Sequence, residues 1–171
     1  MERKFTRKER LAIQGGSAGG ITVGRALTER PDLFAAVVSN VGSLDTLRAE
    51  FTPNGPPNIP EFGSVRTADG FSGLLMMSAY HHVKDGTAYP AVLLVHGVND
   101  PRVEVWQSAK MAARLQAATA HLDAAEPVLL RLDYDAGHGV GSTRFQRSGE
   151  LADVYAFLLW KFGDPAFQAA R

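Results

Sequence analysis

The feature that most constrains the fold is a glycine-rich turn at residues 15–20, GGSAGG, which follows the apolar residues 11–13. Its first five residues fit the pattern G-x-S-x-G, in which a serine stands on a sharp turn between a strand and a helix. Side chains beside such a turn would collide with neighbouring backbone, so we expect glycine to be required on both sides of Ser17. A glycine-rich connector without function is the alternative. It explains neither the apolar residues before the turn nor the helical pattern of residues 21–30.

Two later apolar runs are each followed by a loop that carries a residue type able to activate a serine. Residues 91–96 read as a buried strand and precede Asp100. Residues 128–132 read as another strand and precede His138, in the loop DAGHG. Such groups gather beyond the carboxyl ends of parallel strands. A serine needs a base to take its proton, and the base needs an acid to fix its tautomer. We therefore predict Ser17 as nucleophile, Asp100 as acid and His138 as base.

Other interpretations of these residues remain open at this point. Asp133 and Asp135 lie closer to His138 in sequence, but both precede its turn and would approach the ring from the wrong side. Asp100 could cap a helix, since the following Pro101 suits a first helical position. Capping and catalysis are compatible roles for one carboxylate. His138 could also be an ordinary histidine of a surface loop.

Four segments carry a more specific signal: LAIQGGSAGG (11–20), RPDLF (30–34), NDPRV (99–103) and DAGHG (135–139). Through them the chain resembles the catalytic domain of the prolyl oligopeptidase family of serine hydrolases. The resemblance implies an α/β-hydrolase fold, the three roles given above, and peptide or small ester substrates without a cofactor or metal. It also implies that Arg102 points into the site and holds a substrate carbonyl or carboxylate. The backbone N–H of Ala18, at the start of the helix after the turn, is our candidate oxyanion donor.

The chain departs from the family pattern in two places. The family carries a tryptophan that stacks on the substrate proline, whereas residues 51–62 contain none. We therefore expect no strict preference for proline. The family also has strands before the serine turn, and a tyrosine there supplies a second oxyanion donor. Neither has a counterpart in this sequence. We expect residues 10–14 to form a sheet edge that pairs with a second copy in a homo-oligomer.

Composition narrows the function classes further. The chain has 18 basic and 18 acidic residues and no cysteine. This balance predicts neither a nucleic-acid nor a membrane partner, and the lack of cysteine excludes disulfides, thiol catalysis and cysteine-ligated zinc. A cytoplasmic location is expected, with the periplasm as the alternative. We interpret His81, His82 and His96 as packing or polar-contact residues, because none has a carboxylate at metal-ligand spacing.

The periodicity predicts one α/β domain over residues 1–171, with a mostly parallel sheet and helices on both faces. The predicted strands are 10–14, 35–39, 91–96 and 128–133, and the predicted helices are 19–30, 70–78, 105–119 and 144–162. Between the second and third strands runs a long excursion, residues 42–90, which we expect to line the site or act as a lid.

Two functions of different classes follow from the sequence. The first is a serine hydrolase that cleaves peptide or small ester bonds through a Ser-Asp-His triad and an acyl-enzyme. The alternative is a truncated, catalytically weak or inactive domain that serves as a binding or assembly module.

Overall fold

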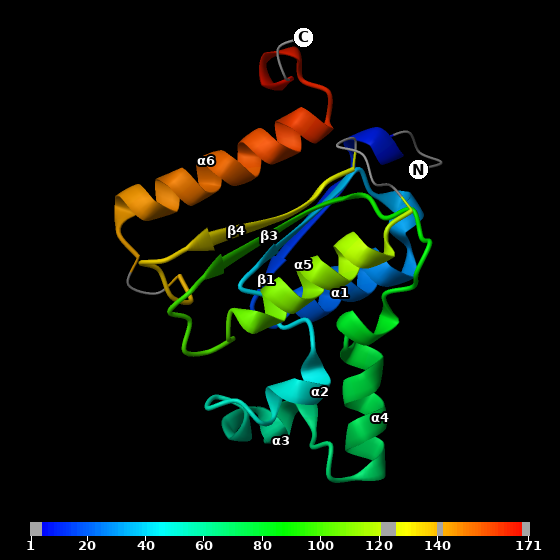
Figure 1. Cartoon of the computed structure of the whole chain (residues 1–171), viewed down its shortest axis with the longest axis vertical. Helices are drawn as coiled ribbons and strands as arrows, with labels where there is room; N and C mark the ends of the chain where they lie inside the picture. The colour runs from blue at the N-terminus through cyan, green and yellow to red at the C-terminus, as the bar shows by residue number, and fades with distance from the viewer. Residues whose placement is uncertain (1–4, 121–125, 140–141, 169–171) are drawn as a thin grey trace.

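A computed structural model describes residues 5–120, 126–139 and 142–168 (Figure 1). Its sheet has the strands β1 (Ala12–Gly16), β2 (Ala36–Asn40), β3 (Ala91–Gly97) and β4 (Val128–Asp133). Its helices are α1 (Gly19–Glu29), α2 (Thr46–Ala49), α3 (Ile59–Phe62), α4 (Ala68–Met77), α5 (Trp106–Ala118) and α6 (Arg144–Lys161). The strands lie in the order β1-β2-β3-β4 and all pairs are parallel. The predicted fold class is confirmed.

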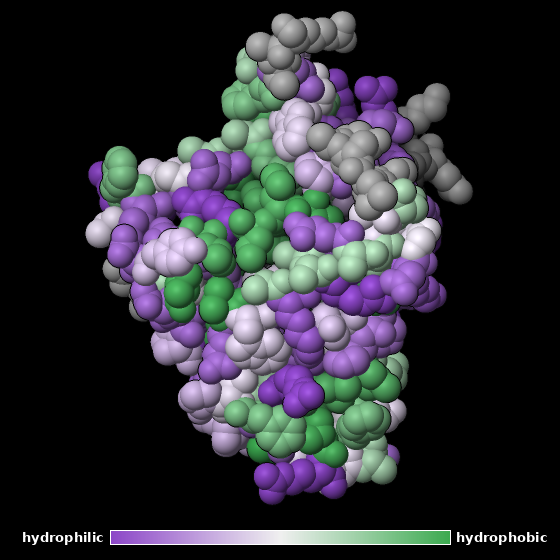
Figure 2. Space-filling model, viewed as in Figure 1, coloured by the Kyte–Doolittle hydropathy of each residue, from purple (hydrophilic) through white to green (hydrophobic). Residues whose placement is uncertain are grey.

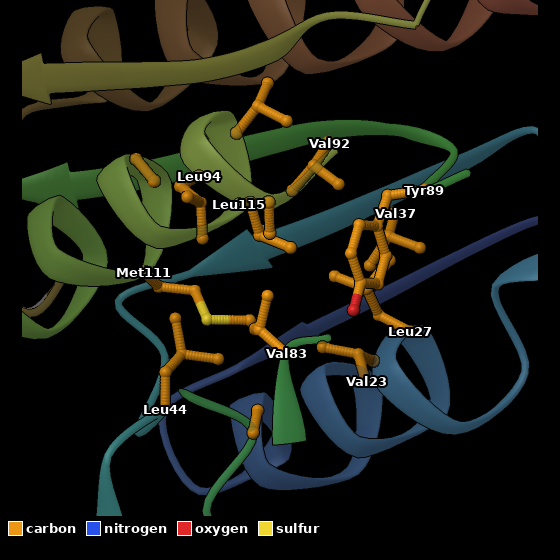
Figure 3. Close-up of a cluster of buried hydrophobic side chains, with 14 of the residues drawn as sticks. Val23, Leu27, Val37, Leu44, Val83, Tyr89, Val92, Leu94, Met111 and Leu115 are labelled. Carbon is orange, nitrogen blue, oxygen red and sulfur yellow. The ribbon is translucent and has the colours of Figure 1, made fainter. Parts of the chain in front are cut away.

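Helices cover the sheet unequally on its two faces. Helices α1 and α5 pack on one face and α6 on the other (Figure 1). The larger core lies under α1 and α5, where side chains of those helices meet β2 and β3 (Figure 3). Every residue of β3 is buried, which explains its unbroken apolar sequence. Figure 2 shows apolar surface between α5 and α6, over β4, where Leu129 is 41% exposed.

The first strand lies two residues later than the sequence predicted. Residues 8–10 form a 3₁₀ turn instead, and the ladder then continues to Gly16, which is paired with Asn40. Glycine is depleted in strands, so a propensity argument assigns these residues to the turn. Pairing with β2 outweighs that preference here.

Strand β1 forms one edge of the sheet, and β2 is its only neighbour among the described residues. An apolar strand with free N–H and C=O groups is a template for pairing with another chain. We expect this chain to self-associate at micromolar concentration, with β1 or its flanking face at the interface. Sedimentation velocity measures this directly. A stable monomer whose residues 12–14 resist hydrogen exchange would contradict the prediction.

The excursion between β2 and β3 contains α2, α3 and α4, which lie beyond one end of the sheet (Figure 1). It is anchored on α5, because the backbone N–H groups of Leu44 and Asp45 both donate to Gln107 Oε1, over 2.8 and 2.9 Å. Helix α4 begins two residues before the predicted start. Thr67 caps it by accepting a hydrogen bond from the Gly70 N–H, 3.2 Å away.

Candidate active site

Ser17 stands at the turn between β1 and α1 with a φ of +55°, in the left-handed region that non-glycine residues seldom adopt. Such a conformation costs about 1–3 kcal/mol and persists only where the surroundings enforce it. Three hydrogen bonds do so here. The Ser17 N–H donates to Asn40 O over 3.0 Å, and Ser17 O accepts from the N–H groups of Gly20 and Ser43, both over 2.9 Å. The turn thereby presents the Ser17 hydroxyl beyond the carboxyl end of the sheet.

The glycines of the turn differ in why they are needed. A Cβ at Gly15 would lie 2.7 Å from Gly19 O, and one at Gly20 would lie 2.6 Å from the Gly42 Cα. A Cβ at Gly19 itself would meet no atom within 4 Å. The expectation that crowding requires glycine on both sides of the serine is therefore wrong at Gly19. The close approach on the helix side occurs one residue later, where α1 packs against the chain that leaves β2.

The three residues predicted to act together lie in one line of hydrogen bonds. His138 Nε2 is 2.9 Å from Ser17 Oγ, and His138 Nδ1 is 2.7 Å from Asp100 Oδ2. A carboxylate can only accept, so Nδ1 carries the proton and Nε2 is free to accept one from the Ser17 hydroxyl. The Asp100 side chain is fully buried and that of His138 is 8% exposed. This arrangement can move a proton from serine to histidine and stabilise the resulting imidazolium.

The loop that carries Asp100 is folded around its carboxylate. Asp100 Oδ1 accepts hydrogen bonds from the backbone N–H groups of Arg102 and Val103, over 2.8 and 3.0 Å. Helix α5 begins only at Trp106, so Asp100 is not its N-cap. One oxygen holds the loop and the other faces His138.

Neither alternative acid has a hydrogen bond to His138 among the described residues. Asp133 Oδ1 instead accepts from the backbone N–H groups of Asp135 and Ala136, both over 3.0 Å, and so shapes the loop before the histidine. This loop packs directly on the end of β3. A Cβ at Gly97 would lie 2.3 Å from Gly137 O, so the close contact requires glycine there.

A cavity of about 180 Å³ opens beside Ser17. Ala18, the candidate oxyanion donor, and Arg102, the candidate substrate-binding residue, both line it. The Ala18 N–H donates to no residue in the described part of the chain. The excursion supplies much of the remaining wall: Thr46, Glu50, Thr52, Asn54, Ile59, Glu61, Phe62 and Leu74. Asn54 Nδ2 donates to Arg102 O over 3.1 Å and ties the excursion to the acid loop.

Sequence reasoning assigned no part of the site to His96. In the structure its ring is fully buried, and its Nε2 lies 3.3 Å from Asp100 Oδ2. The signal in the sequence that could have identified this contact was that His96 precedes Asp100 by four residues, across the turn that follows β3. His81 and His82 make ordinary polar contacts, with Ser78 Oγ and Ser78 O over 2.7 and 2.8 Å.

Among the described residues, no group of three histidine, cysteine or acidic side chains is placed to hold a metal ion. Across the same residues, no helix has the length and apolar character that crossing a bilayer requires.

Comparison with known proteins relates this site to one group. Residues 1–165 match the family model for the prolyl oligopeptidase family. The chain is 36% identical over 160 residues to a prolyl endopeptidase of Elizabethkingia miricola, an alignment that covers 93% of this chain and 22% of the relative. It is 34% identical over 158 residues to a prolyl endopeptidase of Dictyostelium discoideum, covering 92% and 21%.

Solved structures agree with these sequence matches. A structure from a study of two prolyl endopeptidases superimposes with a TM-score of 0.89 at 36% identity, covering 95% of this chain and 24% of that one. Oligopeptidase B from Leishmania major superimposes with a TM-score of 0.87 at 27% identity, covering 95% and 22%. The chain thus spans less than a quarter of the length of these relatives.

Proposed function

This chain belongs to the prolyl oligopeptidase family, and we propose that it is the catalytic portion of a serine peptidase that cleaves short peptides through an acyl-enzyme. The observation that carries the proposal is the line of hydrogen bonds from Ser17 through His138 to Asp100. Its support includes the turn that holds Ser17 under strain, since backbone strain is stored preferentially at functional sites. The named relatives favour this interpretation over a binding module.

The proposed reaction begins when His138 Nε2 accepts the Ser17 proton as Oγ attacks the substrate carbonyl. The Ala18 N–H donates to the oxyanion that forms, and a well-aimed donor of this kind contributes about 3 kcal/mol. The imidazolium then gives its proton to the leaving amine, and the C–N bond breaks. Water, activated by the same histidine, hydrolyses the acyl-enzyme. Arg102, which lines the cavity with Ser17, holds a carbonyl or carboxylate of the substrate.

Covalent labelling tests this proposal without knowledge of the natural substrate. A fluorophosphonate reacts with an activated serine, and intact-mass spectrometry should show one adduct per chain. Complete resistance to the probe, in protein that is folded by circular dichroism, would contradict the proposal and favour the binding-module alternative.

We predict that activated esters are cleaved more readily than proline amides. No tryptophan lines the described cavity wall to stack on proline. An ester also has the better leaving group and depends less on a second oxyanion donor. The measurement compares kcat/KM for a p-nitrophenyl acyl ester and a proline p-nitroanilide, with an alanine p-nitroanilide as the matched control. A clear preference for the proline anilide over both would show that another group replaces the missing ring.

A further inference from the structure

The buried ring of His96 touches the acid loop at two points. Its Nε2 is 2.8 Å from Val103 O and 3.3 Å from Asp100 Oδ2. Its Nδ1 is 2.7 Å from Ser108 Oγ, on α5. The ring lies at the end of β3 and has no exposed side-chain surface. His96 therefore joins the sheet, the acid loop and α5.

These contacts determine the tautomer of the ring. A backbone carbonyl can only accept, so Nε2 carries a proton that it donates to Val103 O and shares with Asp100 Oδ2. Nδ1 is then the acceptor, and the Ser108 hydroxyl donates to it. Burial lowers the pKa of His96, which favours this neutral form.

The Nε2–H of His96 points to Asp100 Oδ2, the same oxygen that accepts from His138. Val103 is held from both sides, because its N–H donates to Asp100 Oδ1 while its carbonyl accepts from His96. The Asp100 carboxylate is thus held by two backbone N–H groups at Oδ1 and by the imidazoles of His138 and His96 at Oδ2.

We propose that His96 is a positioning residue, which holds the Asp100 carboxylate in line with His138 and acts on the reaction only through it. This inference rests on the proposed peptidase function. Removal of the Nε2 donor would free the Val103 carbonyl and let the Asp100 loop shift. A displacement of about 1 Å in such a group can lower turnover by about 100-fold.

Two amide substitutions at position 96 place an N–H donor at one or the other of the two ring-nitrogen positions. In His96→Gln the side-chain N–H₂ reaches the place of Nε2, whereas in His96→Asn it reaches only that of Nδ1. We expect kcat to fall about 10- to 100-fold in H96N with KM within about twofold, and to stay within about fivefold in H96Q. The matched control is Ser108→Ala, which disturbs the other side of the same ring but keeps the Nε2 donor. Equal losses in H96N and S108A would overturn the proposal, because they would indicate a general packing role.

A spectroscopic measurement needs neither turnover nor a folded H96N variant. In ¹⁵N-labelled protein, the downfield ring N–H resonance of His96 should arise from Nε2 and should move in Asp100→Asn. The His138 Nδ1–H resonance should persist in H96Q. A His96 proton on Nδ1, or a His96 resonance unaffected by D100N, would overturn the proposal. If the wild-type protein neither hydrolyses esters nor reacts with the fluorophosphonate, the proposed function fails, while these resonances still decide the contact with Asp100.

Discussion

Replacement of Ser17 by alanine is expected to abolish fluorophosphonate labelling and to lower kcat for ester hydrolysis by about 10⁵-fold or more. The hydroxyl that lies 2.9 Å from His138 Nε2 is then lost, and no covalent intermediate can form. The fold should be unaffected, because the backbone contacts of residue 17 with Asn40 and Gly20 remain. Intact-mass spectrometry and initial rates on a p-nitrophenyl ester measure the two effects.

Ser78 offers a matched control for this substitution. Its hydroxyl lies 2.7 Å from His81 Nδ1, and the same nitrogen lies 3.7 Å from Asp45 Oδ1, so the three residues superficially resemble a triad. Ser78 is fully buried, however, and a probe cannot reach it. Ser78→Ala should retain one adduct per folded molecule. An adduct that survives Ser17→Ala would contradict the assignment of the nucleophile.

Replacement of Asp100 by asparagine is expected to lower kcat by about 10³- to 10⁴-fold with little change in KM. The amide oxygen can still accept from the N–H groups of Arg102 and Val103, so the amide nitrogen turns toward His138. An N–H facing Nδ1 favours the tautomer with its proton on Nε2. That nitrogen then cannot accept the proton of Ser17.

The control for this prediction is Asp135→Asn, which changes an exposed carboxylate in the histidine loop. We expect its kcat to stay within about twofold of wild type, since Asp135 has no hydrogen bond to His138 among the described residues. Initial rates for both variants on one ester, together with thermal melting curves, provide the measurement. A large loss in Asp135→Asn with none in Asp100→Asn would reverse the assignment of the acid.

Local patterns in the sequence predicted most of the fold. Continuous apolar runs identified β2 and β3 to within one residue at each end, because parallel strands covered on both faces leave no polar alternation. The run of residues 128–133 also matched β4, although Leu129 is exposed there. The order of the candidate serine, acid and histidine was also local information, since each follows a strand whose carboxyl end lies at the same sheet edge. The limits of β1 and α4 were less accurate, because a ladder partner and a Thr67 cap set them.

Contacts between distant segments could not be predicted in this way. His138 and Ser17 meet across 121 positions of sequence, and spacing alone gives no distance between them. The sequence suggested that the excursion lines the site, but which of its residues form the cavity wall depends on how separate elements pack. The same holds for the proton that His96 shares with Asp100. The sequence by itself determined the elements and the chemical types at the sheet edge, because hydrophobic periodicity and turn residues act over a few positions. Only the tertiary structure decided which carboxylate faces the histidine and what holds it there, because hydrogen bonds form between groups that folding brings together.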